Sequence, residues 1–300
     1  MMPKVLVICG ATASGKTALS VECAKRFNGE VISADSMLVY RGLDVGTAKP
    51  NIEERDGVLH HLIDVVSPQE EFSVSDYEKL ALPIVDRLLE EGKTPIICGG
   101  TGFYVNALLY KRQFGQAGAD PKIRAKYEQI LAENGKTYLH HLLAEIDPES
   151  AEILHENDVK RVIRALEIFD VTGKKKSEQT DDFTPRYDFV AVAVDYPREL
   201  LYDRINRRVD KMFEDGLMEE VTALLNSGVY IDNQCMQGIG YKEIATGLAE
   251  GKSVGEIKEE IKKNTRNYAK RQITFFKRMQ NLTLLPYEQA TAENVEKLLQ

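Results

Sequence analysis

A glycine-rich segment near the start of the chain has the residue types and spacing that cradle a phosphate group. Residues 10–17, GATASGKT, match the pattern G-x-x-x-x-G-K-[ST] without a departure. The apolar run 4–9 predicts a buried strand before this loop, and the stretch 16–26 predicts a helix after it. Glycines let the backbone wrap an oxyanion, and the first turn of a helix directs free N–H groups and partial positive charge at it. We therefore expect a diphosphate or triphosphate to bind here.

Two side chains of this loop would take part in that binding. The ammonium group of Lys16 would reach the terminal phosphoryl oxygens, and the hydroxyl of Thr17 would hold a Mg²⁺ ion. An ordinary glycine turn is the alternative interpretation, and the flanking strand and helix argue against it. The loop alone identifies neither the phosphate compound nor its reaction.

Further polar residues follow two other predicted strands. Asp35 comes directly after the apolar run 30–34, and Thr101 lies in the glycine-rich turn after the run 95–98. Because ligands bind at the carboxyl edge of an open α/β sheet, both residues should lie near the phosphate loop. The Asp35 carboxylate could ligate Mg²⁺, accept a proton from a nucleophile or cap a helix. Capping of the turn is the alternative role for Thr101.

Alternating strand and helix patterns predict the elements that must position these residues. The expected strands cover 5–9, 30–34, 95–98, 189–194 and 282–285, with helices between most of them. Between about 111 and 187 the strand pattern disappears, and helices are predicted over 121–133, 136–145, 148–156 and 158–171. One long helix is expected from Pro197 to about residue 227, and an amphipathic one from about 255 to 279.

This pattern predicts an α/β fold with a P-loop NTPase-like parallel sheet core flanked by helices, and a helical insertion domain. The core would comprise residues 1–110 plus 188–300, and the insertion residues 111–187. Four scattered cysteines without a C-x-x-C pair indicate reduced thiols rather than zinc or disulfides. No run approaches the about 20 apolar residues of a membrane span, and no signal peptide precedes the first strand. We expect a cytoplasmic protein.

Charge is distributed unevenly along the chain. The net charge of −8 argues against wholesale electrostatic coating of nucleic acid. The segment 262–278 nevertheless carries seven basic residues and no acidic one. These residues, called the basic stripe below, are Lys262, Lys263, Arg266, Lys270, Arg271, Lys277 and Arg278. A local basic stripe on an acidic protein suggests a specific anionic partner.

Several longer segments together closely resemble the tRNA dimethylallyltransferase family, over nearly the whole chain. They are GATASGKT at 10–17, DSMLVYRGLDVGTAKP at 35–50, HHLIDV at 60–65, GGTGFY at 99–104, KRVIRALEI at 160–168, GLMEEV at 216–221, GIGYKE at 238–243 and AKRQITFFKR at 269–278. The resemblance implies transfer of a dimethylallyl group from dimethylallyl diphosphate to N6 of adenosine 37, next to the anticodon in tRNA. The leaving group would be diphosphate, and the cofactor Mg²⁺.

The resemblance also implies roles for individual residues. The diphosphate would be held by Gly10, Thr12, Ala13, Ser14, Gly15, Lys16 and Thr17, with Mg²⁺ on Thr17. Asp35 would remove the proton from N6, and Thr101 would orient the amine or the donor. The family has a catalytic arginine in the region of Arg204, Arg207 and Arg208, and we favour Arg208 as the clamp on diphosphate.

The anticodon stem-loop of tRNA is the macromolecular partner that the resemblance implies. Asp35, Thr101 and the loop Ser36, Met37 and Leu38 would hold the flipped adenine. Further contacts would come from Arg124, Lys160, Arg161, Arg164, Gln237, Gly238, Gly240, Tyr241, Lys242, Lys270 and Arg271. Lys160 stands where the family usually has Gln, and a solvated helix face is the alternative for Arg161 and Arg164. We expect Tyr268, Phe275 and Phe276 to pack the last long helix onto the core.

Three other functions are compatible with parts of the sequence. A small-molecule kinase would use the same loop for ATP, but it needs neither the helical insertion nor the basic stripe. An enzyme that prenylates free adenine nucleotides is disfavoured by the same two features. A non-enzymatic RNA-binding module leaves the phosphate loop and Asp35 unexplained. Binding of ATP to the loop stays open, and we expect a monomer.

Overall fold

The computed structural model describes residues 4–111, 120–179 and 183–300. The chain divides into two compact units, which are described separately. The first unit comprises Met1–Leu109 with Pro185–Gln300, and the second comprises Tyr110–Thr184.

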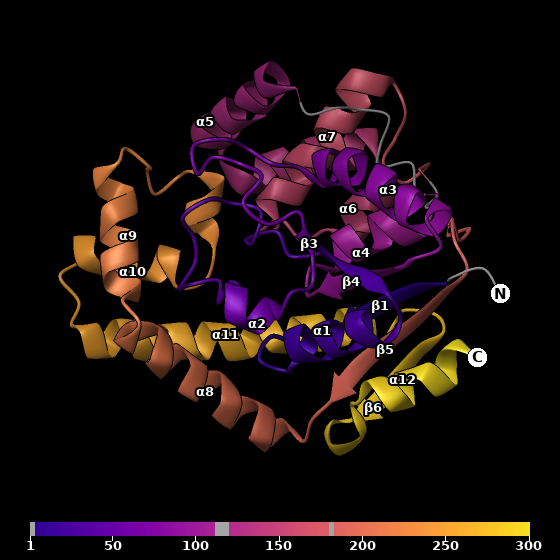
Figure 1. The fold of residues 1–300 in the computed structure, drawn as a ribbon. Helices are drawn as coiled ribbons and strands as arrows, with labels where there is room; N and C mark the ends of the chain where they lie inside the picture. The colour runs from indigo at the N-terminus through magenta and orange to yellow at the C-terminus, as the bar shows by residue number, and fades with distance from the viewer. Residues whose placement is uncertain (1–3, 112–119, 180–182) are drawn as a thin grey trace. The chain divides into compact units, whose positions relative to one another are not determined.

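A parallel β-sheet forms the centre of the first unit (Figure 1). Its strands are β1 (Val5–Cys9), β2 (Gly29–Ser33), β3 (His60–His61), β4 (Thr94–Gly99), β5 (Phe189–Asp195) and β6 (Leu282–Pro286). Their order across the sheet is β3-β2-β4-β1-β5-β6, and every neighbouring pair is parallel. All five residues of β1 are buried, as expected for an inner strand of a sheet covered on both faces. The predicted α/β fold with a parallel sheet is confirmed.

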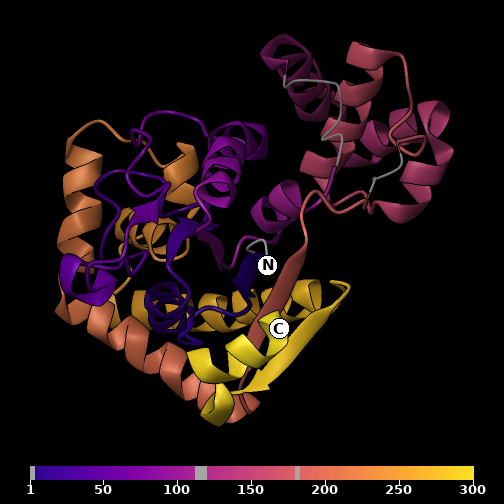
Figure 2. The same ribbon diagram turned by 45° about the vertical axis from the view of Figure 1, so that its right-hand side comes forward.

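Helices cover this sheet and connect its strands. The first unit contains α1 (Lys16–Arg26), α2 (Ile52–Arg55), α3 (Val74–Glu90), α4 (Gly102–Leu109), α8 (Arg198–Glu214), α9 (Leu217–Asn226), η1 (Gln234–Gln237), α10 (Tyr241–Ala249), α11 (Val254–Phe276), η2 (Tyr287–Gln289) and α12 (Ala292–Leu299). Leu19 of α1 and Val295 of α12 join Ile8 of β1 in one buried cluster. Figure 2 shows α12 beside β6, at the end of the chain.

The ends of β2 and β4 are tied together where the site lies. The N–H of Ala34, just after β2, donates to the carbonyl of Cys98 in β4 at 2.8 Å. The N–H of Thr101, just after β4, donates back to the carbonyl of Ala34 at 3.0 Å. A Cβ at Gly99 would lie 2.1 Å from that same carbonyl oxygen, so only glycine allows this approach. The turns that carry Asp35 and Thr101 are therefore fixed to each other by their backbones.

The second unit is helical and has its own apolar core. It contains α5 (Pro121–Ile146), α6 (Pro148–Ile153) and α7 (Val159–Thr172). Gly135 has φ 81° and ψ 171°, which are not helical, so α5 consists of two helical segments, as predicted. Tyr127, Leu143 and Leu166 are among the buried residues of its core.

Two predictions about the elements of the first unit are wrong. The long helix expected after Pro197 is two helices, because α8 ends at Glu214 and Gly216 adopts the left-handed conformation with φ 98°. The short strand β3 was not expected, because two histidines give no apolar run. It is formed by pairing of His60 and His61 with β2.

Candidate active site

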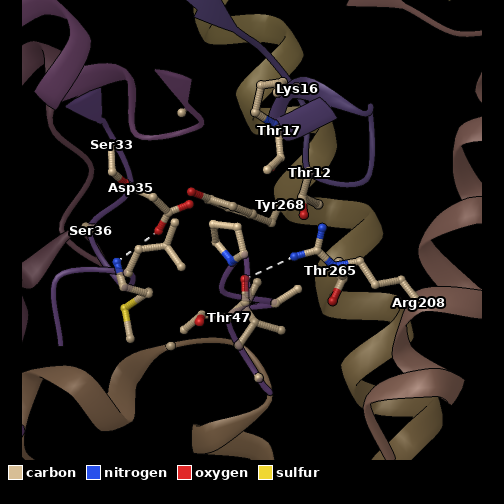
Figure 3. Close-up of a pocket in the computed structure, with 18 of the residues that line it drawn as sticks. Thr12, Lys16, Thr17, Ser33, Asp35, Ser36, Thr47, Arg208, Thr265 and Tyr268 are labelled. Carbon is tan, nitrogen blue, oxygen red and sulfur yellow. Dashed lines mark hydrogen bonds between the residues drawn. The ribbon is translucent and has the colours of Figure 1, made fainter. Parts of the chain in front are cut away.

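A pocket of about 360 Å³ lies at the carboxyl edge of the sheet in the first unit (Figure 3). Its walls include Lys16 and Thr17 of the phosphate loop, Asp35 after β2 and Arg208 of α8. A neighbouring cavity of about 510 Å³ is lined by residues 13–17 of the loop and also by Arg208. The predicted anion-binding loop and the predicted carboxylate thus share one pocket.

The phosphate loop has the backbone shape that an anion requires. Gly10 and Gly15 have φ values of 124° and 81°, which favour glycine. The hydroxyl of Ser14 donates to the carbonyl of Ala11 at 2.8 Å, and Nζ of Lys16 donates to the same carbonyl at 2.5 Å. No side chain among the described residues caps the start of α1. The first N–H groups of this helix are therefore left for a ligand.

Two half-buried cations face this pocket. Burial lowers the pKa of the Lys16 ammonium, and the charge of Arg208 lowers it further. Burial also lowers the pKa of Arg208, although Asp35 and Glu54 oppose the shift. One guanidinium nitrogen of Arg208 donates to the carbonyl of Thr47 at 3.1 Å. An anion between Lys16 and Arg208 would relieve the unfavourable burial of both charges.

Among the three arginines considered for catalysis, only Arg208 lines both cavities. Arg204 lines only the neighbouring cavity, where its Nε donates to the carbonyl of Ala13 at 2.9 Å. Arg207 is exposed and pairs with Asp203 at 2.9 Å. Of the three, Arg208 is therefore the arginine that lines the same pocket as Asp35.

Asp35 and Thr101 each accept a backbone hydrogen bond from the loop that follows β2. Oδ1 of Asp35 accepts the N–H of Met37 at 2.9 Å, and Oγ1 of Thr101 accepts the N–H of Ser36 at 3.0 Å. Figure 3 shows the Asp35 carboxylate and the Tyr268 hydroxyl pointing toward each other. The carboxylate lies in the pocket and so could accept a proton from a group bound there.

Helix α11 supplies one wall of the pocket, which the sequence did not predict. Thr265, Tyr268 and Gln272 line the pocket from this helix, and Arg271 lies at the same pocket. Burial raises the pKa of Tyr268 to about 12 and Asp35 adds to the shift, so its hydroxyl stays protonated at neutral pH. Tyr268 is partly buried and also lines the pocket, a role that the sequence did not predict, whereas Phe276 is buried as expected. The signal available was the spacing of the residues at 261, 265, 268 and 272, which puts them on one helix face.

The segment 44–47 forms another wall and is held by hydrogen bonds to a residue that is distant in the sequence. The carboxylate of Glu220 in α9 accepts the N–H groups of Asp44, Val45 and Gly46 at 2.7 to 3.1 Å. The hydroxyl of Tyr241 donates to Glu220 at 2.5 Å. Glu220 thereby fixes the segment whose Thr47 carbonyl orients Arg208. The motif GLMEEV at 216–221 contains Glu220, but its pattern does not indicate this role.

The residues 237–242 differ in how far they could reach a macromolecule. Tyr241 is only 1% exposed, and its ring lies under Gly46, where a Cβ would come within 2.6 Å of it. Tyr241 therefore supports the wall of the pocket and is too buried to contact a macromolecule. Gly238 is buried against Met37, whereas Gln237 and Lys242 are exposed. Gly240 has φ 101° and stands at the start of α10.

The basic stripe does not form one continuous exposed face. Lys262 is 13% exposed and pairs with Asp210 and Glu259 at 2.9 and 3.0 Å. Arg266 donates to the side chain of Asn206 at 2.6 Å. Lys270 is exposed, as are Lys263, Lys277 and Arg278. The stripe is therefore divided into charges that are already paired within the first unit and charges that face solvent.

In the second unit, two of the predicted RNA contacts meet on a buried carboxylate. Glu167 is fully buried and accepts hydrogen bonds from Arg124 at 3.0 Å and Arg164 at 2.6 Å. Lys160 and Arg161 of α7 are exposed, and the guanidinium of Arg161 lies 3.6 Å from the carboxylate of Asp158. Hydrogen bonds to a buried carboxylate orient Arg124 and Arg164, whereas Lys160 and Arg161 have no such anchor among the described contacts.

The pocket also offers oxygen donors that suit Mg²⁺. Thr17 and Asp35 line it together with Ser33, which is 3% exposed and whose hydroxyl finds no hydrogen-bond partner among the described residues. Mg²⁺ prefers oxygen ligands, and it is usually bound by one or two protein groups, waters and substrate phosphates. The described residues contain no cluster of three or more His, Cys, Asp or Glu side chains for a metal. The donor set thus fits a magnesium ion that a phosphate ligand helps to hold.

Comparisons with known proteins give one consistent result. The model of the IPP transferase family matches residues 38–279. A tRNA dimethylallyltransferase of Acetivibrio thermocellus is 50% identical over 94% of this chain and 91% of its own. One from Halalkalibacterium halodurans is 47% identical over 94% and 91%.

Solved structures agree with these relatives. A tRNA isopentenylpyrophosphate transferase from Bacillus halodurans superimposes with a TM-score of 0.74 at 42% identity, covering 99% of this chain and 96% of that one. A eukaryotic dimethylallyltransferase described as acting on tRNA gives a TM-score of 0.83 at 34% identity, covering 96% and 74%. None of the helices described here is long and apolar enough to cross a membrane.

Proposed function

Because the chain belongs to the IPP transferase family, we propose that its pocket transfers the dimethylallyl group of dimethylallyl diphosphate to N6 of adenosine 37 in tRNA and releases diphosphate. The observation that carries this proposal is the meeting of Lys16, Arg208 and Asp35 in one pocket. Two cations suit the departing diphosphate, and a carboxylate across the pocket suits the proton of the attacking amine.

The reaction exchanges one bond to carbon for another. The bond between C1 of the dimethylallyl group and the diphosphate oxygen breaks, and its electron pair leaves with the diphosphate. A bond forms from N6 of adenine to C1, and N6 gives up one proton to the carboxylate of Asp35. Lys16, Arg208 and the N–H groups at the start of α1 stabilise the negative charge that grows on the leaving oxygen.

Mg²⁺ belongs to this proposal as the cofactor. Thr17 would hold it, with the hydroxyl of Ser33 and the diphosphate oxygens as further oxygen donors. When bound, the ion would add positive charge at the diphosphate.

The residues beside Asp35 would hold the acceptor base. The hydroxyl of Thr101 accepts the N–H of Ser36 and so fixes that residue. The exposed Gln237 also lines the pocket. An adenine must leave its loop stack to reach this pocket, so we propose base flipping. Lys270 of α11 and the arginines on Glu167 would contact phosphates of the anticodon stem-loop.

One assay tests the reaction and its alternatives. The protein is incubated with Mg²⁺, labelled dimethylallyl diphosphate and either unmodified tRNA or AMP, and separately with ATP and candidate alcohols. We expect label to enter tRNA. Transfer to AMP alone, or phosphoryl transfer from ATP alone, would contradict the proposal and favour one of the rival enzymes.

Variants of Asp35 test its role as the base. Asp35→Asn preserves the size of the side chain but cannot accept the proton, so we expect transfer to fall by about 100-fold or more. The Kd for tRNA, measured by filter binding, should stay within about threefold of the wild-type value, and Asp35→Ala should behave alike. Asp195→Asn is the matched control, because Asp195 ends β5 at the same edge of the sheet and is exposed. A large loss of tRNA binding in Asp35→Ala would make Asp35 a recognition residue instead.

A further inference from the structure

Gln272 of α11 is a buried amide that bonds to two separate loops. It is 5% exposed. Its Oε1 accepts the N–H of Thr12 at 2.8 Å, and its Nε2 donates to the carbonyl of Gly100 at 3.0 Å. The backbone donor at Thr12 and the backbone acceptor at Gly100 fix which way the amide points. One side chain thus connects the phosphate loop after β1 with the turn after β4.

The turn is shaped to let α11 come this close. A Cβ at Gly100 would lie 2.1 Å from Nε2 of Gln272. A Cβ at Gly102 would lie 2.0 Å from the ring of Phe275, one turn further along the same helix. Side chains at either position would push α11 away, so the two glycines that flank Thr101 are required by this packing.

These contacts join the two halves of the proposed reaction. Thr12 belongs to the loop that would hold diphosphate. Gly100 precedes Thr101, whose hydroxyl accepts the N–H of Ser36 next to Asp35. A displacement at carbon requires the attacking nitrogen, the carbon and the leaving oxygen to be aligned, and a misplacement of about 1 Å can cost about 100-fold in rate.

We propose that the Gln272 amide is a positioning residue, which sets the separation of the phosphate loop from the Thr101 turn and so aligns the donor with the adenine amine. The inference rests on the proposed function, since it concerns the geometry of that transfer. Gln272 acts through Thr12 and Gly100, and the Thr101 turn transmits its effect to the loop that carries Asp35.

The chemistry of the amide suggests two informative variants. Gln272→Met keeps the length of the side chain but removes both hydrogen bonds. Gln272→Glu keeps an acceptor for the N–H of Thr12, but its ionised form turns an oxygen toward the carbonyl of Gly100. When that carboxyl group is protonated, its O–H can donate to Gly100 and restore both bonds. Its defect should therefore depend on pH.

The experiment measures single-turnover transfer to tRNA, Kd values for inorganic diphosphate and tRNA, and Tm. We expect Gln272→Met to lower the transfer rate by 10-fold to about 100-fold while both Kd values stay within about threefold. The rate of Gln272→Glu relative to wild type should rise as the pH falls from about 8 to about 5.5, whereas the relative rate of Gln272→Met should stay constant.

Asn264→Ala is the matched control, because this amide of α11 also makes a tertiary hydrogen bond, to Glu243 at 2.7 Å, but does not bridge the two loops. It should lower Tm and leave the transfer rate within about twofold. All rates are measured well below the lowest Tm of the set.

Three results would overturn the inference. They are a rate for Gln272→Met within about twofold of wild type, a loss that lies entirely in the two Kd values, and a pH-independent relative rate for Gln272→Glu. Should Gln272→Met fail to fold, the pH comparison on Gln272→Glu decides. If the wild-type protein transfers no label to tRNA, the proposed function itself fails, whereas normal wild-type transfer with unaffected variants refutes only the role of Gln272.

Discussion

At the scale of single residues, the pocket brings two cations together. Lys16 begins α1 and Arg208 belongs to α8, and both line the pocket. Burial lowers the pKa of Lys16, and the charge of Arg208 adds to the shift. A bound diphosphate would favour the charged form of Lys16. Ligand binding and protonation of Lys16 are therefore linked.

This linkage predicts how diphosphate binding changes with pH. Because the pKa of Lys16 is lowered in the free protein, its charge is lost in the pH range below the ordinary lysine pKa of about 10.5. We expect affinity for inorganic diphosphate to fall over this range. An arginine stays charged throughout, so Lys16→Arg should show a flatter dependence. Calorimetry on both proteins measures this, and the ligand's own titration cancels in the comparison. Parallel pH dependences would contradict the prediction.

At the scale of elements, α9 and α10 control a loop that belongs to neither of them. Glu220 of α9 accepts three consecutive N–H groups of the segment 44–46, and Tyr241 of α10 donates to Glu220. The next residue, Thr47, accepts the hydrogen bond from Arg208. Changes at the contact between Gly46 and Tyr241 should therefore reach the pocket.

Gly46→Ala tests this connection. The added methyl group would lie 2.6 Å from the ring of Tyr241, which is only 1% exposed. We expect a loss of about 1–3 kcal/mol in the free energy of unfolding and weaker binding of diphosphate. Gly255→Ala is the control, because the nearest atom to its Cβ is 4.0 Å away and helix α11 favours alanine. Denaturant unfolding and calorimetry measure both effects, and equal results for the two variants would argue against the connection.

Elements with a local signal could be predicted from the sequence, and contacts between distant elements could not. The strand, glycine loop and first helix are encoded within residues 5–26, and the structure has them there. The periodicity of α11 predicts a helix, and its basic residues predict a face exposed to solvent. Neither pattern predicts that another face lines a pocket. The face that carries Tyr268 and Gln272 becomes a pocket wall only because β1 and β4 end opposite it. The left-handed backbone of Gly216 separates α8 from α9. The sequence does not reveal this break, because the apolar pattern continues on both sides of the glycine.

At the scale of the whole molecule, a charge cluster around β2 makes stability depend on pH. Burial would raise the pKa of Glu30, but hydrogen bonds from Lys93, His61 and Arg87 lower it to about 2. Since the pKa is below its unfolded value, the stabilisation is present above about pH 4.5 and is lost as the pH falls toward 2. The shift corresponds to about 3 kcal/mol.

Glu30→Gln should therefore be less stable than wild type at pH 7 and lose less stability on acidification. Urea unfolding of both proteins between about pH 7 and pH 3 measures the difference. Glu90→Gln is the control, because Glu90 is an exposed glutamate of α3. We expect it to follow the wild-type curve. If the free energy of unfolding of Glu30→Gln fell as steeply with decreasing pH as that of wild type, other groups would cause the pH dependence.

The distribution of charge over the molecule determines how an acidic protein holds tRNA. With a net charge of −8, binding must depend on the local cations that face solvent rather than on overall charge. Within the basic stripe, Lys270 is exposed, whereas Lys262 is already paired with Asp210 and Glu259. The paired lysine has little to offer a phosphate, because its single ammonium nitrogen is already shared by two carboxylates.

The salt dependence of tRNA binding separates these two lysines. Lys270→Ala should weaken binding and reduce the slope of log Kd against log salt by about 0.7 to 0.9, the release of roughly one counterion. Lys262→Ala should leave the slope unchanged, although it removes the same charge from the same helix. Filter binding between about 50 and 200 mM salt measures both slopes. Equal reductions would mean that the long-range field of α11, rather than contacts by its exposed side chains, attracts the RNA. An unchanged slope in both variants would place the RNA away from this helix.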